Sequence, residues 1–151
     1  MNEAETRAEL IDPALMAAGW GDVAESRIRR EYFISPGRLI GASKRSETSR
    51  ADYVLVYRNR RLSVIEAKAR DVPVGEGVGQ AKRDAGRLNI RHAISTNGKA
   101  IYRIDMHTGK EADADRFPTP DELWNETFSE ENAWRDRFAA IPYETRGGTY
   151  E

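Results

Sequence analysis

Two short apolar runs separated by a polar break dominate the hydrophobic pattern in the middle of the chain. Residues 53–57 and 62–65 are apolar and rich in β-branched side chains, whereas residues 58–61 are polar and include three arginines. Two such runs joined by a few turn-tolerant residues predict a β-hairpin. We expect its turn to centre on Asn59–Arg60.

The flanking patterns predict an α/β chain. An apolar stripe at helical spacing predicts a helix over residues 3–18, which Pro13 bends or restarts. A predicted helix over 80–88 connects the strand that ends near Lys68 to a strand over 92–96, so these two strands should be parallel. The other predicted elements are strands over 28–34, 38–41 and 100–105 and helices over 121–128 and 130–140.

The length of 151 residues suits one domain with a buried core. We expect a central mixed sheet flanked by helices over residues 1–110. Residues 111–151 should form a helical C-terminal extension of the same domain.

Composition excludes several classes of protein. The chain has no cysteine, so disulfides and thiolate metal sites are excluded, and a reducing compartment fits. No apolar run approaches the roughly 20 residues of a membrane span, and no signal-peptide pattern is present. With 32% charged residues, the chain is expected to be a cytoplasmic, globular protein with no membrane partner.

Three charged residues converge on the open end of the predicted hairpin. Glu66 and Lys68 point to one face of their strand because side chains alternate. Asp52 precedes Glu66 by fourteen positions, which places it nearly opposite Glu66 and Ala67. Two carboxylates held close together raise each other's proton affinity unless a cation intervenes. Mg²⁺ is the natural cation for carboxylates and for a third ligand such as the Ala67 carbonyl.

A metal at this position would support phosphodiester hydrolysis. It could polarise the phosphate and lower the pKa of a bound water, while Lys68 orients the water or stabilises the growing charge. Gln80 begins the next helix and could hydrogen-bond a base, a phosphate or the metal's water, or it could simply cap the helix. The alternative for Glu66 and Lys68 is an exposed ion pair that contributes little.

Positive charge is concentrated around this region although the net charge is −1. Between residues 27 and 70 there are twelve arginines and lysines and four acids, and the balance reverses between 111 and 136. A basic core is consistent with local phosphate contact, although each arginine could equally be solvated surface. The polar segment 42–50 is predicted to be a DNA-contacting loop. The candidate DNA contacts are Lys44, Arg45, Arg50, Lys82 and Arg83.

The spacing of Asp52, Glu66 and Lys68 resembles the PD-(D/E)xK nuclease core. The wider pattern is similar to the N-terminal nuclease domain of the motor (R, or HsdR-type) subunit of type I restriction–modification enzymes. The similarity covers most of the chain. The matching segments are IDPALMAAGW (11–20), RADYVLVY (50–57), LSVIEAKA (62–69), GQAKRDA (79–85), STNGKAIY (95–102) and RFPTPDELW (116–124).

This resemblance implies a restriction-endonuclease-like fold and a Mg²⁺-dependent endonuclease domain, with Mn²⁺ as a substitute ion. Asp52, Glu66 and Lys68 match the catalytic positions, and Gln80 matches a family glutamine. Asp84 stands where the family has a tyrosine, which leaves the role of that position open. A further metal-directed carboxylate on the first helix would be Glu3 or Glu9, although both also suit a helix N-terminus.

The resemblance also implies partners. They are double-stranded DNA and the methyltransferase and specificity subunits of the same restriction system. ATP would act only through motor domains expected to follow this chain, so the isolated domain could be weakly active or inactive. Two alternatives remain: a non-catalytic DNA-clamping or subunit-docking module, and a free-standing repair or junction nuclease.

Overall fold

The computed structural model describes residues 1–34 and 49–129 of the chain. It divides into two compact units, Met1–Pro120 and Asp121–Glu151, and the candidate site lies in the first. The predicted strand over 38–41 and the predicted helix over 130–140 lie outside the described residues.

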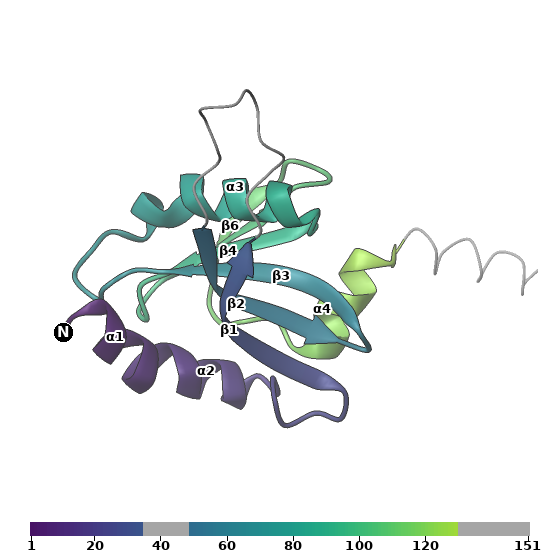
Figure 1. Cartoon of the computed structure of the whole chain (residues 1–151), viewed down its shortest axis with the longest axis horizontal. Coiled ribbons are helices and arrows are strands. Elements are labelled where there is room, and N and C mark those ends of the chain that lie inside the picture. Colours follow the sequence, from purple (N-terminus) through teal and green to yellow (C-terminus); the bar gives the residue numbers. More distant parts are fainter. Residues whose placement is uncertain (35–48, 130–151) are drawn as a thin grey trace, which may run out of the picture. The chain divides into compact units, whose positions relative to one another are not determined.

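A six-stranded mixed sheet forms the centre of the first unit (Figure 1). Its strands follow one another in sequence order, and β3 and β4 form its parallel pair, as the intervening helix predicts. The strands are β1 (Ser26–Ile34), β2 (Ser49–Tyr57), β3 (Arg60–Ala67), β4 (His92–Thr96), β5 (Ile101–Asp105) and β6 (Glu111–Ala114). The predicted α/β fold with a central mixed sheet is therefore confirmed.

Helices cover both faces of this sheet (Figure 1). Helix α3 (Val78–Leu88) lies on one face, where Ala81 and Ala85 pack into a buried cluster with apolar residues of the sheet. Their small side chains allow the helix to approach the strands closely. Helices α1 (Glu3–Thr6) and α2 (Asp12–Ala17) lie along the other face. None of the helices among the described residues is long and apolar enough to cross a membrane.

The predicted N-terminal helix forms, with a local change at its centre. Residues Arg7–Ile11 adopt a single wide π-type turn between α1 and α2. Pro13 follows directly in α2 and has no N–H to donate to the preceding turn, so the wide turn lies where a regular helical hydrogen bond is missing. Trp20, which follows this helix, is fully buried, and its Nε1 donates a hydrogen bond to the Pro118 carbonyl at 2.8 Å.

The β2–β3 hairpin turns one residue earlier than predicted. Arg58 and Asn59 form the turn with φ of 52° and 65°, the left-handed conformation that the favoured two-residue hairpin turn requires. Val56 then pairs with Arg61, which would place Asp52 opposite Ile65 if the ladder continued unchanged.

A β-bulge restores the alignment of the two acids. The ladder shifts between Leu55 and Val56, and from there to its end Tyr53 pairs with Ile65. Continuing this register places Asp52 opposite Glu66. Because a shift by one residue moves every side chain to the other face of the sheet, the bulge decides which residue faces Asp52.

The remaining differences from the predicted elements are local. Ser49 and Arg50 were predicted to belong to a loop, but they pair with Ile34 and Phe33 as the start of β2. Helix α3 begins at Val78 rather than at residue 80, after a 3₁₀ turn at Val74–Gly77. The stretch from residue 111 was predicted to be helical, but its first residues form the edge strand β6. The predicted helix over 121–128 is found as α4 (Pro120–Thr127).

Candidate active site

Asp52 occupies the point where β2 and β3 stop pairing through their backbones. Its Oδ2 accepts a hydrogen bond from the Ala67 N–H at 2.7 Å, in place of a further backbone partner. Its Oδ1 accepts a hydrogen bond from the Arg7 guanidinium. The Asp52 side chain is only 13% exposed, so the two strands and the N-terminal helix fix its position.

Glu66 and Lys68 extend from the end of β3 beside Asp52. The Glu66 side chain is 12% exposed, and its Oε2 lies 3.7 Å from Lys68 Nζ. The Lys68 backbone N–H donates to the Thr96 carbonyl at 2.9 Å, which ties the end of β3 to β4. The structure therefore brings Asp52, Glu66 and Lys68 together at one end of the neighbouring strands β2 and β3.

The two acids destabilise each other's charged forms. Burial and the neighbouring Asp52 charge raise the pKa of Glu66 to about 8, although the Lys68 ammonium acts in the opposite direction. Burial also raises the pKa of Asp52, against the lowering effects of the Ala67 N–H and Arg7. A divalent cation between the two carboxylates would relieve this cost.

The raised pKa predicts how stability depends on pH. The folded protein holds the Glu66 proton more tightly than the unfolded chain, whose Glu pKa is near 4.5. The resulting stabilisation is complete below about pH 4.5 and is lost as the pH rises through about 8. Glu66→Gln, which cannot ionise, should therefore exceed the wild type in stability at pH 9 by at least about 1.4 kcal/mol, the value of one pKa unit.

Urea unfolding of both proteins in chelator at pH 5 and pH 9 measures this effect. Glu66→Gln should gain stability relative to the wild type between the two pH values. An equal difference at both pH values would show that Glu66 titrates normally.

The start of α3 lies directly against Glu66 and Lys68. A Cβ added to Gly77 would lie 3.0 Å from Glu66 Cγ and 3.4 Å from Lys68 Cε. Gln80, one turn further, donates from Nε2 to Asp84 Oδ1 at 2.8 Å and accepts from Arg83 Nη2 at 2.9 Å. These hydrogen bonds tie Gln80 to side chains of its own helix.

Asp84, which replaces the expected tyrosine, is buried on the inner side of α3. Burial raises the pKa of Asp84 while its hydrogen bond with Gln80 lowers it, and its charge adds to the factors that raise the pKa of Glu66. Asp84 therefore adds negative charge near the site and orients the Gln80 amide.

Arg7 connects the N-terminal helix to this site. Its Nη2 hydrogen-bonds Asp52 Oδ1 and lies 2.5 Å from Glu3 Oε2, and its Nη1 hydrogen-bonds Glu31. The i,i+4 spacing of Glu3 and Arg7 predicts their ion pair but not the contacts with the sheet. Of the two early glutamates, Glu3 carries a charge that helps to raise the pKa of Asp52 and of Glu66, whereas Glu9 is exposed.

The donor set fits a magnesium-type ion. Two mostly buried carboxylates lie near each other at the end of the hairpin, beside the predicted third ligand, the Ala67 carbonyl. Within residues 1–34 and 49–129, no three acidic, histidine or cysteine side chains gather closely enough to form a metal cluster. An ion held by two carboxylates would keep several waters, as Mg²⁺ usually does.

The candidate DNA contacts have acidic or polar partners where they are described. Arg50 is exposed and lies 3.7 Å from Glu31, and Lys82 forms a 2.5 Å ion pair with Glu111. Arg83 bonds Gln80, and Lys44 and Arg45 lie outside the described residues. Their roles in DNA contact stay predictions.

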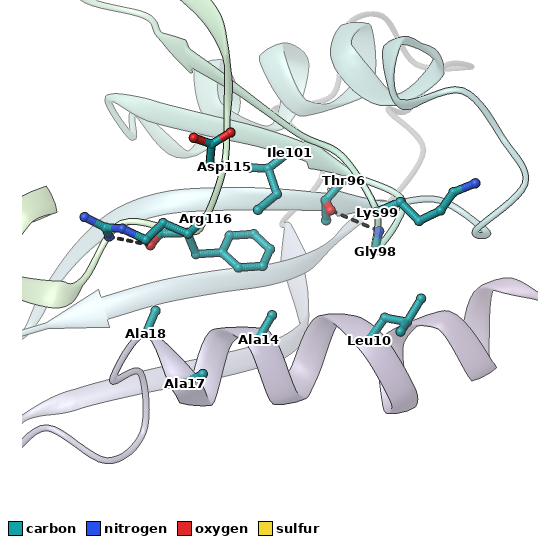
Figure 2. Close-up of a pocket in the computed structure, with 11 residues that line it drawn as sticks. Leu10, Ala14, Ala17, Ala18, Thr96, Gly98, Lys99, Ile101, Asp115 and Arg116 are labelled. Atoms are coloured by element: carbon teal, nitrogen blue, oxygen red, sulfur yellow. Dashed lines mark hydrogen bonds between the residues drawn. The ribbon is translucent and has the colours of Figure 1, made fainter.

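A separate hollow of about 310 Å³ lies between α2 and the β4–β5 hairpin (Figure 2). Leu10 and the alanines of α2 form one wall, opposite Ile101 and the 96–99 turn, and Asp115 and Arg116 lie beside it. None of the four predicted catalytic residues lines it. Asp52 and Glu66 are therefore not part of this hollow.

Comparison with known proteins gives two informative matches. No family model matches the chain. The endonuclease subunit of the type I restriction enzyme EcoAI from Escherichia coli is 31% identical over 134 residues, covering 82% of this chain and 16% of that protein. A solved fragment assigned to the HsdR subunit of a type I restriction enzyme from Vibrio vulnificus YJ016 is 40% identical, with a TM-score of 0.77. That match covers 87% of this chain and 26% of the solved chain, so this chain spans a minor part of both proteins.

Proposed function

The chain is related to the endonuclease (HsdR) subunits of type I restriction enzymes, and we propose that it acts as the DNA-cleaving domain of such a subunit. The relationship confirms the family resemblance seen in the sequence, and the structural match supports a restriction-endonuclease-like core. Hydrolysis of phosphodiester bonds with a bound divalent ion is our proposal for its chemistry.

The observation that carries the proposal is the alignment of Asp52 with Glu66 at the end of the bulged hairpin. The two acids are mostly buried, and burial raises the pKa of both. Such a pair is costly for stability, which a structural role alone does not explain. Perturbed acids clustered in this way are typical of functional sites.

We assign roles to the residues as follows. Asp52 and Glu66, with the Ala67 carbonyl, would hold Mg²⁺ or Mn²⁺, and Glu3 is the additional candidate on the first helix. The bound ion would lower the pKa of a water and neutralise charge on the phosphate. The Lys68 ammonium, 3.7 Å from Glu66, is placed to stabilise negative charge that grows on the phosphate. The Gln80 amide, oriented by Asp84, could hydrogen-bond the water or the DNA.

The partners of the whole enzyme form part of the same proposal. They are double-stranded DNA and the methyltransferase and specificity subunits, with ATP used by motor domains in other parts of the full-length protein. In that arrangement, cleavage by this chain depends on the assembly.

Titration calorimetry with Mn²⁺ tests the metal site. The wild-type chain should bind Mn²⁺ saturably at one site, and Glu66→Ala should lose this binding. Glu111→Ala is the control, because Glu111 is an acid of the same sheet that pairs with Lys82 instead. Absence of binding to the wild type would contradict the proposed function and favour a docking module, for which the buried Asp84 near Glu66 is the supporting observation.

A further inference from the structure

The guanidinium of Arg7 lies beside Asp52, one of the two carboxylates proposed to hold the metal ion. Arg7 Nη2 hydrogen-bonds Asp52 Oδ1, the carboxylate oxygen that the Ala67 N–H leaves available. The Arg7 side chain is 23% exposed, and its buried Nε atom has no hydrogen-bond partner among residues 1–34 and 49–129. A divalent ion that binds Asp52 Oδ1 would compete with Arg7 for that oxygen and would meet its positive charge.

Three carboxylates surround this one guanidinium. Glu3 lies on the same helix, Asp52 lies on β2, and Glu31 lies on the neighbouring strand β1. Arg50 approaches Glu31 from outside at 3.7 Å, and the guanidinium carbon of Arg7 lies 6.0 Å from the centre of the Tyr53 ring. The carboxylates therefore give Arg7 more than one place to bind.

The backbone of Glu31 supports a specific role for its contact with Arg7. Glu31 has a φ of 51°, an unusual value for a glutamate within a strand. The β1–β2 ladder pairs Arg30 with Tyr53 and Tyr32 with Ala51, so it omits Glu31, the residue opposite Asp52. The strand thus departs from regular geometry where the Glu31 carboxylate meets Arg7 Nη1.

We propose that Arg7 is an exchangeable counter-cation of the candidate metal site. It neutralises Asp52 when no divalent ion is bound, and it leaves Asp52 Oδ1 when an ion binds. Glu31 retains the guanidinium through Nη1 during this exchange. The proposal rests on the proposed function, because it requires Asp52 to be a metal ligand.

Competition of this kind weakens ion binding. The ion must break the Arg7–Asp52 pair, and the displaced guanidinium remains nearby as a like charge. The two carboxylates should thus bind a divalent ion less tightly than they would without Arg7.

Calorimetric titration with Mn²⁺ tests this competition. Arg7→Met keeps most of the side-chain volume without the charge, and it should bind Mn²⁺ at least about tenfold more tightly than the wild type. Arg30→Met is the control, because Arg30 carries the same charge nearby but pairs with Asp12 at 3.5 Å. Arg30→Met should stay within about threefold of the wild type. Unchanged or weaker binding by Arg7→Met would overturn the proposal.

Thermal unfolding separates this role from a merely structural one. In chelator, Arg7→Met should unfold at a lower temperature than the wild type, because the carboxylates then repel one another. Saturating Mn²⁺ should remove or reverse that difference, since the ion replaces the missing charge and stabilises the folded state. An equal loss with and without Mn²⁺ would show that Arg7 acts only in packing.

NMR of the arginine side chains tests the exchange in the wild-type chain, so it does not depend on whether a variant folds. Saturation with Mg²⁺ should shift the Arg7 Nε–H resonance and leave that of Arg91, which pairs with Asp105 at 3.0 Å, in place. An unchanged Arg7 resonance at saturation would overturn the exchange.

These outcomes also distinguish a failure of the proposed Arg7 exchange from a failure of the proposed metal site. If the wild type binds Mn²⁺ through Glu66 and Arg7→Met binds no more tightly, only the exchange is wrong. If neither protein binds Mn²⁺, the metal site and the exchange are both wrong.

Discussion

Replacing Glu66 by alanine in the full-length enzyme, assembled with its other subunits, should lower DNA cleavage by at least about a hundredfold. The substitution removes one of the two carboxylates proposed to hold the ion and leaves Asp52 paired with Arg7. Without a held ion, the site loses the group proposed to activate water, and Lys68 alone remains to offset charge on the phosphate. Conversion of supercoiled plasmid to linear DNA, measured with ATP and Mg²⁺ present, gives the rate.

Companion substitutions separate the roles of the three charged residues. Asp52→Ala should lose both cleavage and Mn²⁺ binding, whereas Lys68→Ala should lose cleavage and keep the ion, because the ammonium is not a ligand. Glu111→Ala should cleave normally, and circular dichroism should show that every variant is folded. A normal cleavage rate in Asp52→Ala, Glu66→Ala or Lys68→Ala would remove that residue from the mechanism.

Replacing Gly77 by alanine should destabilise the chain by about 1–3 kcal/mol, the usual cost of overpacking. The new Cβ would lie 2.5 Å from Ser95 Oγ and 3.0 Å from Glu66 Cγ. Ser95 cannot turn away freely, because its hydroxyl donates to the Val74 carbonyl at 2.6 Å. The start of α3 must therefore move away from Ser95 and Glu66, so Mn²⁺ affinity should fall as well. Urea unfolding and calorimetry measure the two effects.

Gly86→Ala is the matched control within the same helix. A Cβ at Gly86 meets nothing within 4 Å, so alanine should stabilise the helix by about 0.5–1 kcal/mol through its better helix propensity. Opposite signs for Gly77 and Gly86, with weaker Mn²⁺ binding by Gly77→Ala, would support close contact of the start of α3 with Ser95 and Glu66. A stabilising Gly77→Ala with unchanged Mn²⁺ binding would contradict that contact.

The hairpin that carries the candidate site was predictable because its signals are local. Alternation along residues 62–68 fixes the common face of Glu66 and Lys68, and the fourteen-residue spacing brings Asp52 to the same end. The turn was predicted one residue too late, and the bulge between Leu55 and Val56 was not predicted. Moving the turn by one residue shifts the pairing by two residues, the bulge returns one of them, and only the structure shows how they combine.

The Arg7 cluster could not be predicted because its contacts are not local in sequence. Arg7 meets Glu31 and Asp52 across 24 and 45 positions, and the left-handed backbone of Glu31 has no glycine or turn signal. Strand β6 escaped prediction for a different reason. Its four residues, EADA, are acidic and mostly exposed, so they lack the apolar alternation of a half-buried strand.

The crystal structure of this chain soaked in Mn²⁺, with anomalous scattering recorded for the metal, shows whether Asp52 and Glu66 share an ion. We expect one anomalous peak between the carboxylates of Asp52 and Glu66, within about 2.0–2.3 Å of an oxygen of each, and Arg7 moved away from Asp52 Oδ1. A fully soaked crystal without a peak there, or with the ion bound elsewhere, would rule out the proposed metal site.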